Sequence, residues 1–242
     1  MIIKTKGIVL RSTKYSETSL ILDVFTEAKG LCTYIVSGVR TPKARIKAGM
    51  LQVMSILDMV VYHRDDKDIA RTKEIKPAYL YQSIPFDITK SAVGLFMVEL
   101  AQKTIKEKEQ NQRIFDFLID SFQYLDQTEN SVANIPLIFM LELTTHLGLM
   151  PSGVASGDYP YFDMKEGVFI AEQNTSAHTL GVELSTALTQ LLQSSKTTCH
   201  DVFINRHVRK ALLEKMIDYY RLHVENFNGL NAHTILQEVL SE

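Results

Sequence analysis

The segment of residues 39–49 carries the residues whose type and spacing most directly suggest a chemical role. Pro42 and Gly49 punctuate it, which is typical of an exposed loop. Its four cations are Arg40, Lys43, Arg45 and Lys47. Four more precede it: Lys4, Lys6, Arg11 and Lys14. Clustered Lys and Arg neutralise the phosphates of a nucleic-acid backbone without reading its bases. We therefore predict a phosphate-binding groove here; the alternative interpretation is a solvated turn.

Aromatic residues are interleaved with these cations, and their faces could stack on bases. They are Tyr15, Phe25, Tyr34 and Tyr62. The alternative is packing in the core, which is the more common place for an aromatic residue on a strand.

A second group of cations stands near the start of a predicted helix and consists of Arg206, Arg209 and Lys210. Cations at this end of a helix oppose the helix dipole slightly, so an anionic partner is one explanation for them. An exposed helix face is the other.

The sequence contains no pattern that predicts catalysis. We find no phosphate loop, no dinucleotide fingerprint and no nucleophile elbow, and the His residues are scattered. Cys32 and Cys199 are too far apart for a CxxC motif, and Cys32 is expected to be a small buried hydrophobic residue. Cys199, His200 and His207 lack a fourth metal ligand. We therefore predict a protein that is not an enzyme and has no metal and no cofactor.

The charge of the chain is unevenly distributed. Residues 1–81 hold 14 Lys and Arg against 8 Asp and Glu, a balance of +6, whereas the rest of the chain has a balance of −8. This asymmetry indicates two domains with different partners, which we place at residues 1–80 and 81–242.

The front domain has the pattern of a small β-barrel. Apolar, β-forming stretches separated by turn signals predict five strands. They fall at residues 6–11, 19–26, 31–37, 51–62 and 69–75. Five strands within about 80 residues fit an OB-fold, a barrel that commonly binds nucleic acid.

Near Pro85 the apolar period changes from that of a strand to that of a helix. Six helices are expected, at residues 87–107, 111–127, 134–148, 181–194, 205–226 and 232–240. Asp87 and Asn205 are expected to cap two of them, and Gly148 to end a third. A small hairpin insertion near residues 158–172 should turn at residues 165–167. The fold class is thus α+β, a five-stranded OB-fold barrel followed by a mostly helical domain.

The chain shows no secretion signal, because Lys4 and Lys6 interrupt its apolar start. The longest apolar stretch, residues 135–143, is too short to span a bilayer and contains Glu142. We therefore expect a cytoplasmic protein.

Two stretches near the front and one near the end resemble the RecO family of bacterial recombination mediators. The stretches are GIVLRSTKYSETSLILDVFTEAKG, SGVRTPKARIKAGMLQ and YYRLHVENFNGLNAHTILQEVL. Within them, Leu10-Arg11, Phe25-Thr26 with Gly30, and Gly38 with Arg40 match the family pattern. The resemblance covers the whole chain and is most specific in its first 60 residues.

The resemblance implies a DNA-repair protein that binds single- and double-stranded DNA and anneals complementary strands. It also implies that the protein helps to load RecA onto DNA coated by single-strand-binding protein (SSB). The implied partners are RecR and the acidic C-terminal tail of SSB, and the implied location is the bacterial cytoplasm, with the nucleoid.

We assign these two expected functions to the two groups of cations. The expected DNA-binding residues are Arg11, Lys14, Arg40, Lys43, Arg45 and Lys47. The expected tail-binding residues are Arg206, Arg209 and Lys210. Phe115, Phe122 or Leu212 could supply an apolar pocket beside them.

One departure from the family concerns metal. Some RecO-like proteins carry a four-cysteine zinc module after the third helix, but residues 149–172 contain no Cys, so we expect no structural zinc. Two other functional classes remain open from the sequence: an interaction scaffold that does not bind DNA directly, and an enzyme with an unrecognised site.

Overall fold

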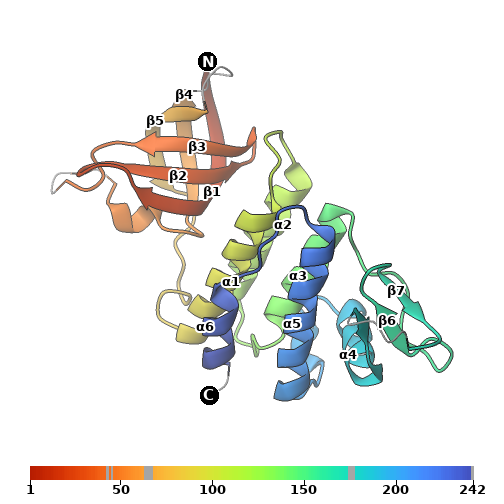
Figure 1. The fold of residues 1–242 in the computed structure, drawn as a ribbon. Helices are drawn as coiled ribbons and strands as arrows, with labels where there is room; N and C mark the ends of the chain where they lie inside the picture. The colour runs from red at the N-terminus through yellow and green to blue at the C-terminus, as the bar shows by residue number, and fades with distance from the viewer. Residues whose placement is uncertain (42–43, 45, 63–67, 174–177, 241–242) are drawn as a thin grey trace. The chain divides into compact units, whose positions relative to one another are not determined.

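The computed structural model describes residues 1–41, 44, 46–62, 68–173 and 178–240. The chain forms two compact units. One consists of Met1–Pro85 with Ala101–Asp126, and the other of Phe86–Leu100 with Gln127–Glu242. The first contains a β-barrel and the second is largely helical, so the α+β class is confirmed (Figure 1).

The barrel is closed by five strands in the order β1-β2-β3-β5-β4. They are β1 (Ile2–Lys14), β2 (Leu20–Thr26), β3 (Gly30–Val36), β4 (Ile56–Tyr62) and β5 (Ile69–Pro77). β1 pairs antiparallel with β4 through its first half and with β2 through its second, while β3 and β5 are parallel. This confirms the five-stranded barrel expected for an OB-fold.

β1 can serve two neighbours because it bends. Its register with β2 shifts between Val9 and Arg11, the mark of a bulge that increases local twist. Gly7 is required at the close approach to β2, since a Cβ there would lie 2.5 Å from Val24 Cγ1. Any larger residue at position 7 would push the two strands apart.

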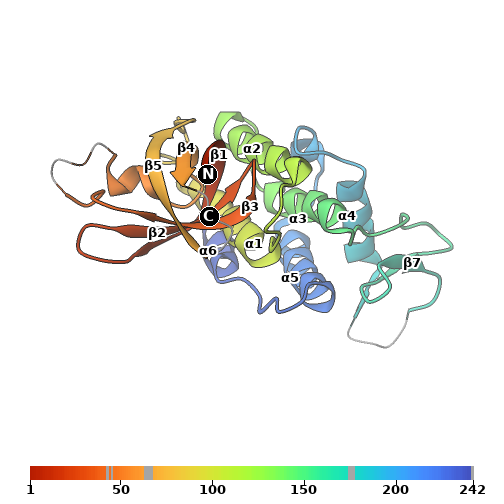
Figure 2. The same ribbon diagram turned by 90° about the horizontal axis from the view of Figure 1, so that it is seen from above.

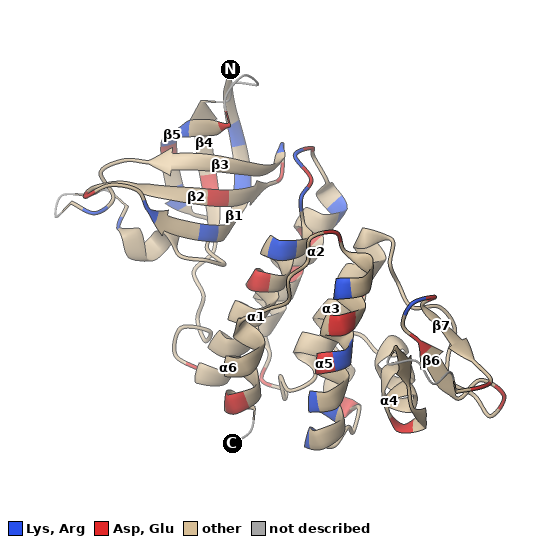
Figure 3. Cartoon of the chain, in the orientation of Figure 1, with Lys and Arg blue, Asp and Glu red and all other residues tan. Residues whose placement is uncertain are grey.

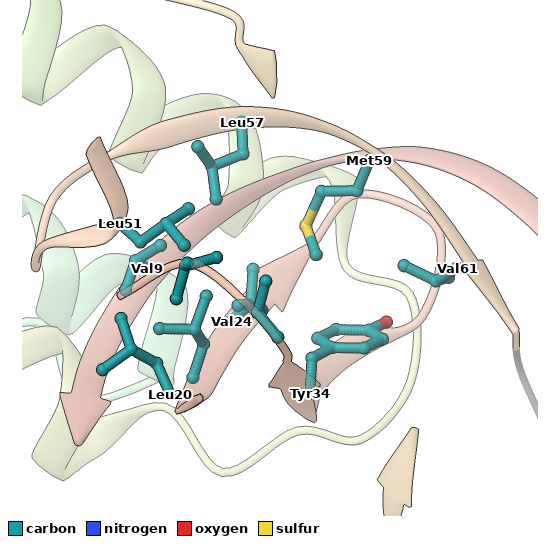
Figure 4. Packing of buried hydrophobic residues seen from close by; sticks show 11 residues of the cluster. Val9, Leu20, Val24, Tyr34, Leu51, Leu57, Met59 and Val61 are labelled. Carbon is teal, nitrogen blue, oxygen red and sulfur yellow. The ribbon is translucent and has the colours of Figure 1, made fainter. Parts of the chain in front are cut away.

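The interior of the barrel is filled from strands β1 to β4 and from two residues between β3 and β4, Val39 and Leu51. Figure 4 shows Val9, Val24, Tyr34 and Met59 converging in this core. Leu51, in the short 3-10 helix η1 (Ala48–Leu51), is fully buried in the same cluster. Burial of an apolar side chain of this size stabilises the fold by about 2 kcal/mol.

The prediction of one long strand over residues 51–62 is wrong in its first part. Leu51 ends η1, and Met54 has a φ of 70°, a left-handed conformation that no regular strand contains. β4 therefore starts at Ile56. The apolar run misleads because Leu51 fills the barrel from a turn and not from a strand.

Helix α2 (Gln112–Gln127) belongs to the same unit as the barrel. Phe115 packs against Phe25 of β2, with ring centroids 6.3 Å apart. At the other end of α2, the Asp126 carboxylate accepts hydrogen bonds from the backbone N–H groups of Gln82, Ser83 and Ile84. The Tyr79 hydroxyl donates a further bond of 2.9 Å to it. Asp126 thus fixes the segment that follows the last barrel strand.

The helical unit contains α3 (Ile135–Leu147), α4 (Val182–Leu192), α5 (Arg206–His223) and α6 (Ala232–Val239), together with the first part of α1 (Ile88–Thr104). A small sheet of β6 (Tyr161–Asp163), β7 (Val168–Ile170) and β8 (Thr179–Leu180) completes it. This sheet lies beside α4, as Figure 2 shows.

The expected helix caps are confirmed. The Asp87 carboxylate accepts bonds from Thr89 N–H and Lys90 N–H, and the Asn205 side chain accepts one from Val208 N–H at 2.9 Å. Gly148 ends α3 with a φ of 72°. These local signals depend only on neighbouring residues, which is why the sequence reveals them.

Aromatic packing holds the small sheet against α5. Phe162 of β6 lies 5.0 Å from Phe169 of β7 and 6.0 Å from Tyr219 of α5, measured between ring centroids. The Tyr219 hydroxyl donates to the Leu149 carbonyl at 2.7 Å, and its ring lies 4.3 Å from that of His223. The β6–β7 hairpin, which turns at Gly167 as expected, is positioned by these rings.

We predict that Asp126→Asn lowers the free energy of unfolding by about 3 kcal/mol at neutral pH, because an amide NH2 group would face backbone donors. Burial raises the pKa of Asp126, but hydrogen bonds from Gln82, Ile84, Ser83 and Tyr79 outweigh it and hold that pKa below its ordinary value of 3.8. The stabilisation is therefore present above about pH 4 and is lost as the pH falls through the lowered pKa. Urea unfolding followed between pH 3 and pH 7 measures both effects.

Asp120→Asn is the matched control, because Asp120 lies on the same helix but is exposed. It should change stability by less than about 0.5 kcal/mol. Equal stability of the wild type and the Asp126 variant at pH 7 would contradict the role given to Asp126.

Candidate nucleic-acid interface

A groove of about 980 Å³ opens on the barrel unit. β3 and β5 pair only from Thr33–Ile69 to Ile35–Arg71, because β3 ends at Val36 while β5 continues to Pro77. Residues from both strands, from β1 and β4, and from the loop after β3 line the groove. The groove therefore follows from the short seam between β3 and β5.

The groove is lined by more cations than carboxylates. The cations are Lys4, Lys6, Arg71, Lys73 and Lys76, and the carboxylates are Glu27, Asp58 and Glu74. Lys6, Asp58 and Lys76 form one cross-strand row over β1, β4 and β5, with Lys76 Nζ 3.4 Å from an Asp58 carboxylate oxygen. The other four cations form no ion pair with a described residue, which leaves them available to an anion.

Of the cations from which the sequence predicts a phosphate-binding groove, Lys4 and Lys6 line this groove, whereas Arg11, Lys14, Arg40 and Lys47 do not. Arg11 is exposed, 4.0 Å from Asp23, and Lys14 pairs with Glu17 at 3.3 Å. Arg40 and Lys47 are exposed on the loop after β3. None of these four lines the groove, and Lys43 and Arg45 lie outside the described residues.

The loop itself does border the groove. Gly38, Val39 and Thr41 are among the lining residues. The Arg40 guanidinium donates to the Ser16 carbonyl at 3.2 Å, and Arg40 N–H donates to the Thr18 carbonyl at 3.3 Å. These bonds join the loop to the turn between β1 and β2, so the structure brings the predicted cations Lys14 and Arg40 to one region.

Sequence reasoning missed the cations of β5, namely Arg71, Lys73 and Lys76. The signal was present in IARTKEIKP, where cations recur every second or third residue. Recognising it required knowing that β5 lies beside β4 and that its other edge pairs with β3 only briefly. Figure 3 shows basic residues on β1 and β5, whereas β2, β3 and β4 contain no Lys or Arg.

The aromatic residues divide into two kinds. Phe25 and Tyr34 are buried in the barrel unit, so the hypothesis that they stack on bases is wrong. Tyr15 and Tyr62 are 61% and 44% exposed, which leaves their faces accessible to a base. Side chains that point into a barrel cannot be told from outward ones until the register is known.

A second candidate site is a narrow cleft in the helical unit, between α3, α5 and α6. Arg206, Arg209 and Lys210, the three predicted partner-binding cations, all line it. Arg209 is half-buried and donates to the Ile204 carbonyl at 3.1 Å; burial, and then the charge of Arg206, lower the pKa of its guanidinium. The cations lie in the first turns of α5 (Figure 3). An anion bound here would relieve their mutual repulsion.

The apolar walls of this cleft come from residues that the sequence did not indicate. They are Pro136, Leu137, Leu213, Leu236 and Leu240. Phe115, Phe122 and Leu212, proposed for this role, are each at most 2% exposed and do not line the cleft, so that proposal is wrong. These three side chains are buried in the interior of the protein.

Comparisons with known proteins support one family over the whole chain. A family profile described as "Recombination protein O N terminal" matches residues 1–81, and one described as "Recombination protein O C terminal" matches residues 85–230. The chain is 36% identical to DNA repair protein RecO of Flavobacterium johnsoniae over 244 residues, and 30% identical to that of Phocaeicola vulgatus over 241 residues. Both alignments cover 100% of each chain.

The chain belongs to the RecO family. This family comprises non-catalytic recombination mediators of DNA repair, so the expectation that the chain is not an enzyme is supported by its membership. RecO identity also implies DNA and proteins of the RecFOR pathway as partners. In the ranges that the structure describes, no helix combines the length and apolarity needed to cross a bilayer.

The cysteines of this RecO-family chain lie in different surroundings. Cys199 is buried, and burial, followed by the charge of Glu142, raises the pKa of its thiol to about 11, so it is protonated at neutral pH. Cys32 is half-buried at the edge of the barrel core and not fully buried as expected. Within the described part of the chain, no group of three or more His, Cys, Asp or Glu residues could hold a metal ion.

Proposed function

We propose that the barrel binds the backbones of single- and double-stranded DNA along its groove, and that the protein thereby mediates annealing and RecA loading. The observation that carries this proposal is a groove of about 980 Å³ with four cations that form no ion pair with a described carboxylate. Those cations are Lys4, Lys6, Arg71 and Lys73.

The arrangement favours phosphate binding over base recognition. Lys4 and Lys6 stand two residues apart on β1, so they project from one face of the strand. Glu27, Asp58 and Glu74 are interleaved with these cations and repel phosphates, so a bound strand should contact the groove at its cations. The loop cations Arg40, Lys43, Arg45 and Lys47, with Arg11 and Lys14, would extend this path beyond the groove.

Annealing follows from the same chemistry. Cations that neutralise two complementary strands reduce their mutual repulsion, so pairing can proceed on binding energy alone. We propose that this requires no nucleotide cofactor, in keeping with the lack of a phosphate loop in the sequence.

The helical unit would connect this activity to other proteins. We propose that the cleft between α3, α5 and α6 takes the acidic C-terminal tail of SSB, with Arg206 and Arg209 on its terminal carboxylate. Its apolar walls would take the adjacent side chain. We also propose RecR as a partner. We propose that the protein acts in the bacterial cytoplasm, in association with the nucleoid.

We predict that replacing Lys4, Lys6, Arg71 and Lys73 with Ala makes single-stranded DNA binding less dependent on salt. The slope of log K against the logarithm of the salt concentration should become less negative by about 3, at about 0.7 per lost phosphate contact. Replacing Arg40, Lys43, Arg45 and Lys47 instead tests the loop, with a similar expected change. Fluorescence anisotropy with a labelled oligonucleotide at several salt concentrations measures both slopes.

The matched control removes four cations elsewhere in the chain: Lys108, Lys165, Lys196 and Arg221. Its slope should equal that of the wild type. If the groove variant also keeps the wild-type slope, the groove is not the DNA path. If the wild type does not bind DNA at all, the protein is an interaction scaffold.

For the tail, the probe is a short acidic peptide ending in Phe. We predict that the double variant Arg206→Ala, Arg209→Ala binds this peptide about ten- to hundredfold more weakly than the wild type. This range corresponds to the loss of about 1.5–3 kcal/mol for a charge-assisted hydrogen bond. The same peptide with an amidated C-terminus should bind the wild type equally weakly. Titration of the labelled peptide measures both affinities, and equal affinity of the variant and the wild type would place the tail elsewhere.

A further inference from the structure

The cleft between α3, α5 and α6 is too small for the ligand that its chemistry suits. Its volume is about 30 Å³. A cavity that holds a benzene ring has a volume of about 150 Å³, so this cleft is far too small for an aromatic side chain. An acidic peptide can reach the cations at the rim, but its apolar side chain cannot enter unless one wall moves.

α6 is the wall that fills the cleft. Leu236 is fully buried, and Leu236, Gln237 and Leu240 line the cleft opposite Leu213 of α5. The leucines of α6 thus cover the same apolar surface that a peptide side chain would cover.

α6 is also the least firmly held of the three walls. α3 buries nine of its 13 residues and α5 seven of 18, whereas Leu236 is the one buried residue of the eight in α6, all of which are described. Glu99 of α1 accepts bonds from Asn231 N–H at 2.9 Å and Ala232 N–H at 2.7 Å, which holds the start of α6. Gln237 donates to Glu214 of α5 at 3.2 Å, on an exposed surface.

The backbone before α6 provides a pivot. Gly229 has a φ of 83°, and Leu230, just after it, is buried. The family profile for the C-terminal region ends at residue 230, immediately before α6. A short helix attached in this way can leave the cleft without disturbing α3 or α5.

We propose that α6 is a displaceable lid whose leucines occupy the apolar part of the tail-binding cleft and that a peptide with an apolar C-terminal residue must displace it to bind. This inference rests on the proposed docking of an acidic tail. The closed lid lowers the apparent affinity by the fraction of molecules in which the cleft is open. The cost of opening the lid falls on a ligand whose apolar side chain enters the cleft, and a carboxylate that reaches only the rim cations does not bear it.

Tethering α6 tests this directly. Glu214→Cys and Gln237→Cys are introduced together in a Cys32→Ser background of the full chain, and a short bismaleimide links α5 to α6. The control is the same variant treated with a monofunctional maleimide, which modifies both thiols without joining the helices. The probe is the labelled acidic peptide ending in Phe.

The tethered protein should bind the probe at least about tenfold more weakly than the control, because the open state is removed. Equal affinities of the tethered and control proteins would overturn the lid. Leu236→Ala, which removes the leucine plug, should tighten binding by about three- to tenfold. Weaker binding would mean that α6 is a wall of the site and not its lid.

Glu99→Gln provides a second route should Leu236→Ala fail to fold, because it loosens the start of α6 without touching the cleft. It should also tighten binding, and unchanged affinity would count against the lid. Arg206→Ala with Arg209→Ala separates the two claims. If that variant binds like the wild type, the docking site itself is wrong; if it loses binding while the tether has no effect, only the lid is wrong.

Discussion

The short parallel seam between β3 and β5 is the constraint on which the binding face of the barrel depends. A five-stranded barrel closes only if its strands are tilted and staggered, so neighbouring strands do not all pair over their full length. Here β1 pairs with β2 and with β4 over seven residue pairs each, whereas β3 and β5 share only three. The stagger of the strands therefore shortens the pairing between β3 and β5. Past Arg71, β5 continues beside β4 alone and the groove opens.

The same seam helps to explain how a chain of net charge −2 can present the basic groove that we propose for DNA. Binding depends on the local arrangement of charge and not on the total. The groove is lined by Lys4 and Lys6 of β1 and by Arg71 and Lys73 of β5. Lys76 also lines it but forms an ion pair with Asp58. Further along the chain, Asp126 fixes the segment after β5, so that α2 and the barrel form one compact unit.

How far the sequence reveals this protein depends on the range of the interactions involved. Caps at Asp87 and Asn205 and the turn at Gly148 were predictable because they involve residues at most a few positions apart. The start of β4 was not, because Leu51 fills the barrel core from a 3-10 helix. A local apolar pattern cannot distinguish that role from a strand.

The candidate sites show the same limit. Arg206, Arg209 and Lys210 were found because they are close in sequence, whereas the Leu236 and Leu240 walls of their cleft come from another helix. The cations of β5 were missed because they become neighbours of Lys4 and Lys6 only through strand pairing across β4. Arg11 and Arg40, which the sequence indicated, do not line the groove, and we propose them only as an extension of the DNA path.

The central claim is that DNA phosphates occupy the groove of the barrel, and lysine-reactivity footprinting tests it most directly. The full chain is acetylated briefly with and without a single-stranded oligonucleotide, and the modified lysines are measured by mass spectrometry. The account predicts that DNA protects Lys4, Lys6 and Lys73, while the reactivity of Lys165 on the β6–β7 turn stays the same. Unchanged reactivity of the three groove lysines under conditions where the oligonucleotide is bound would contradict it.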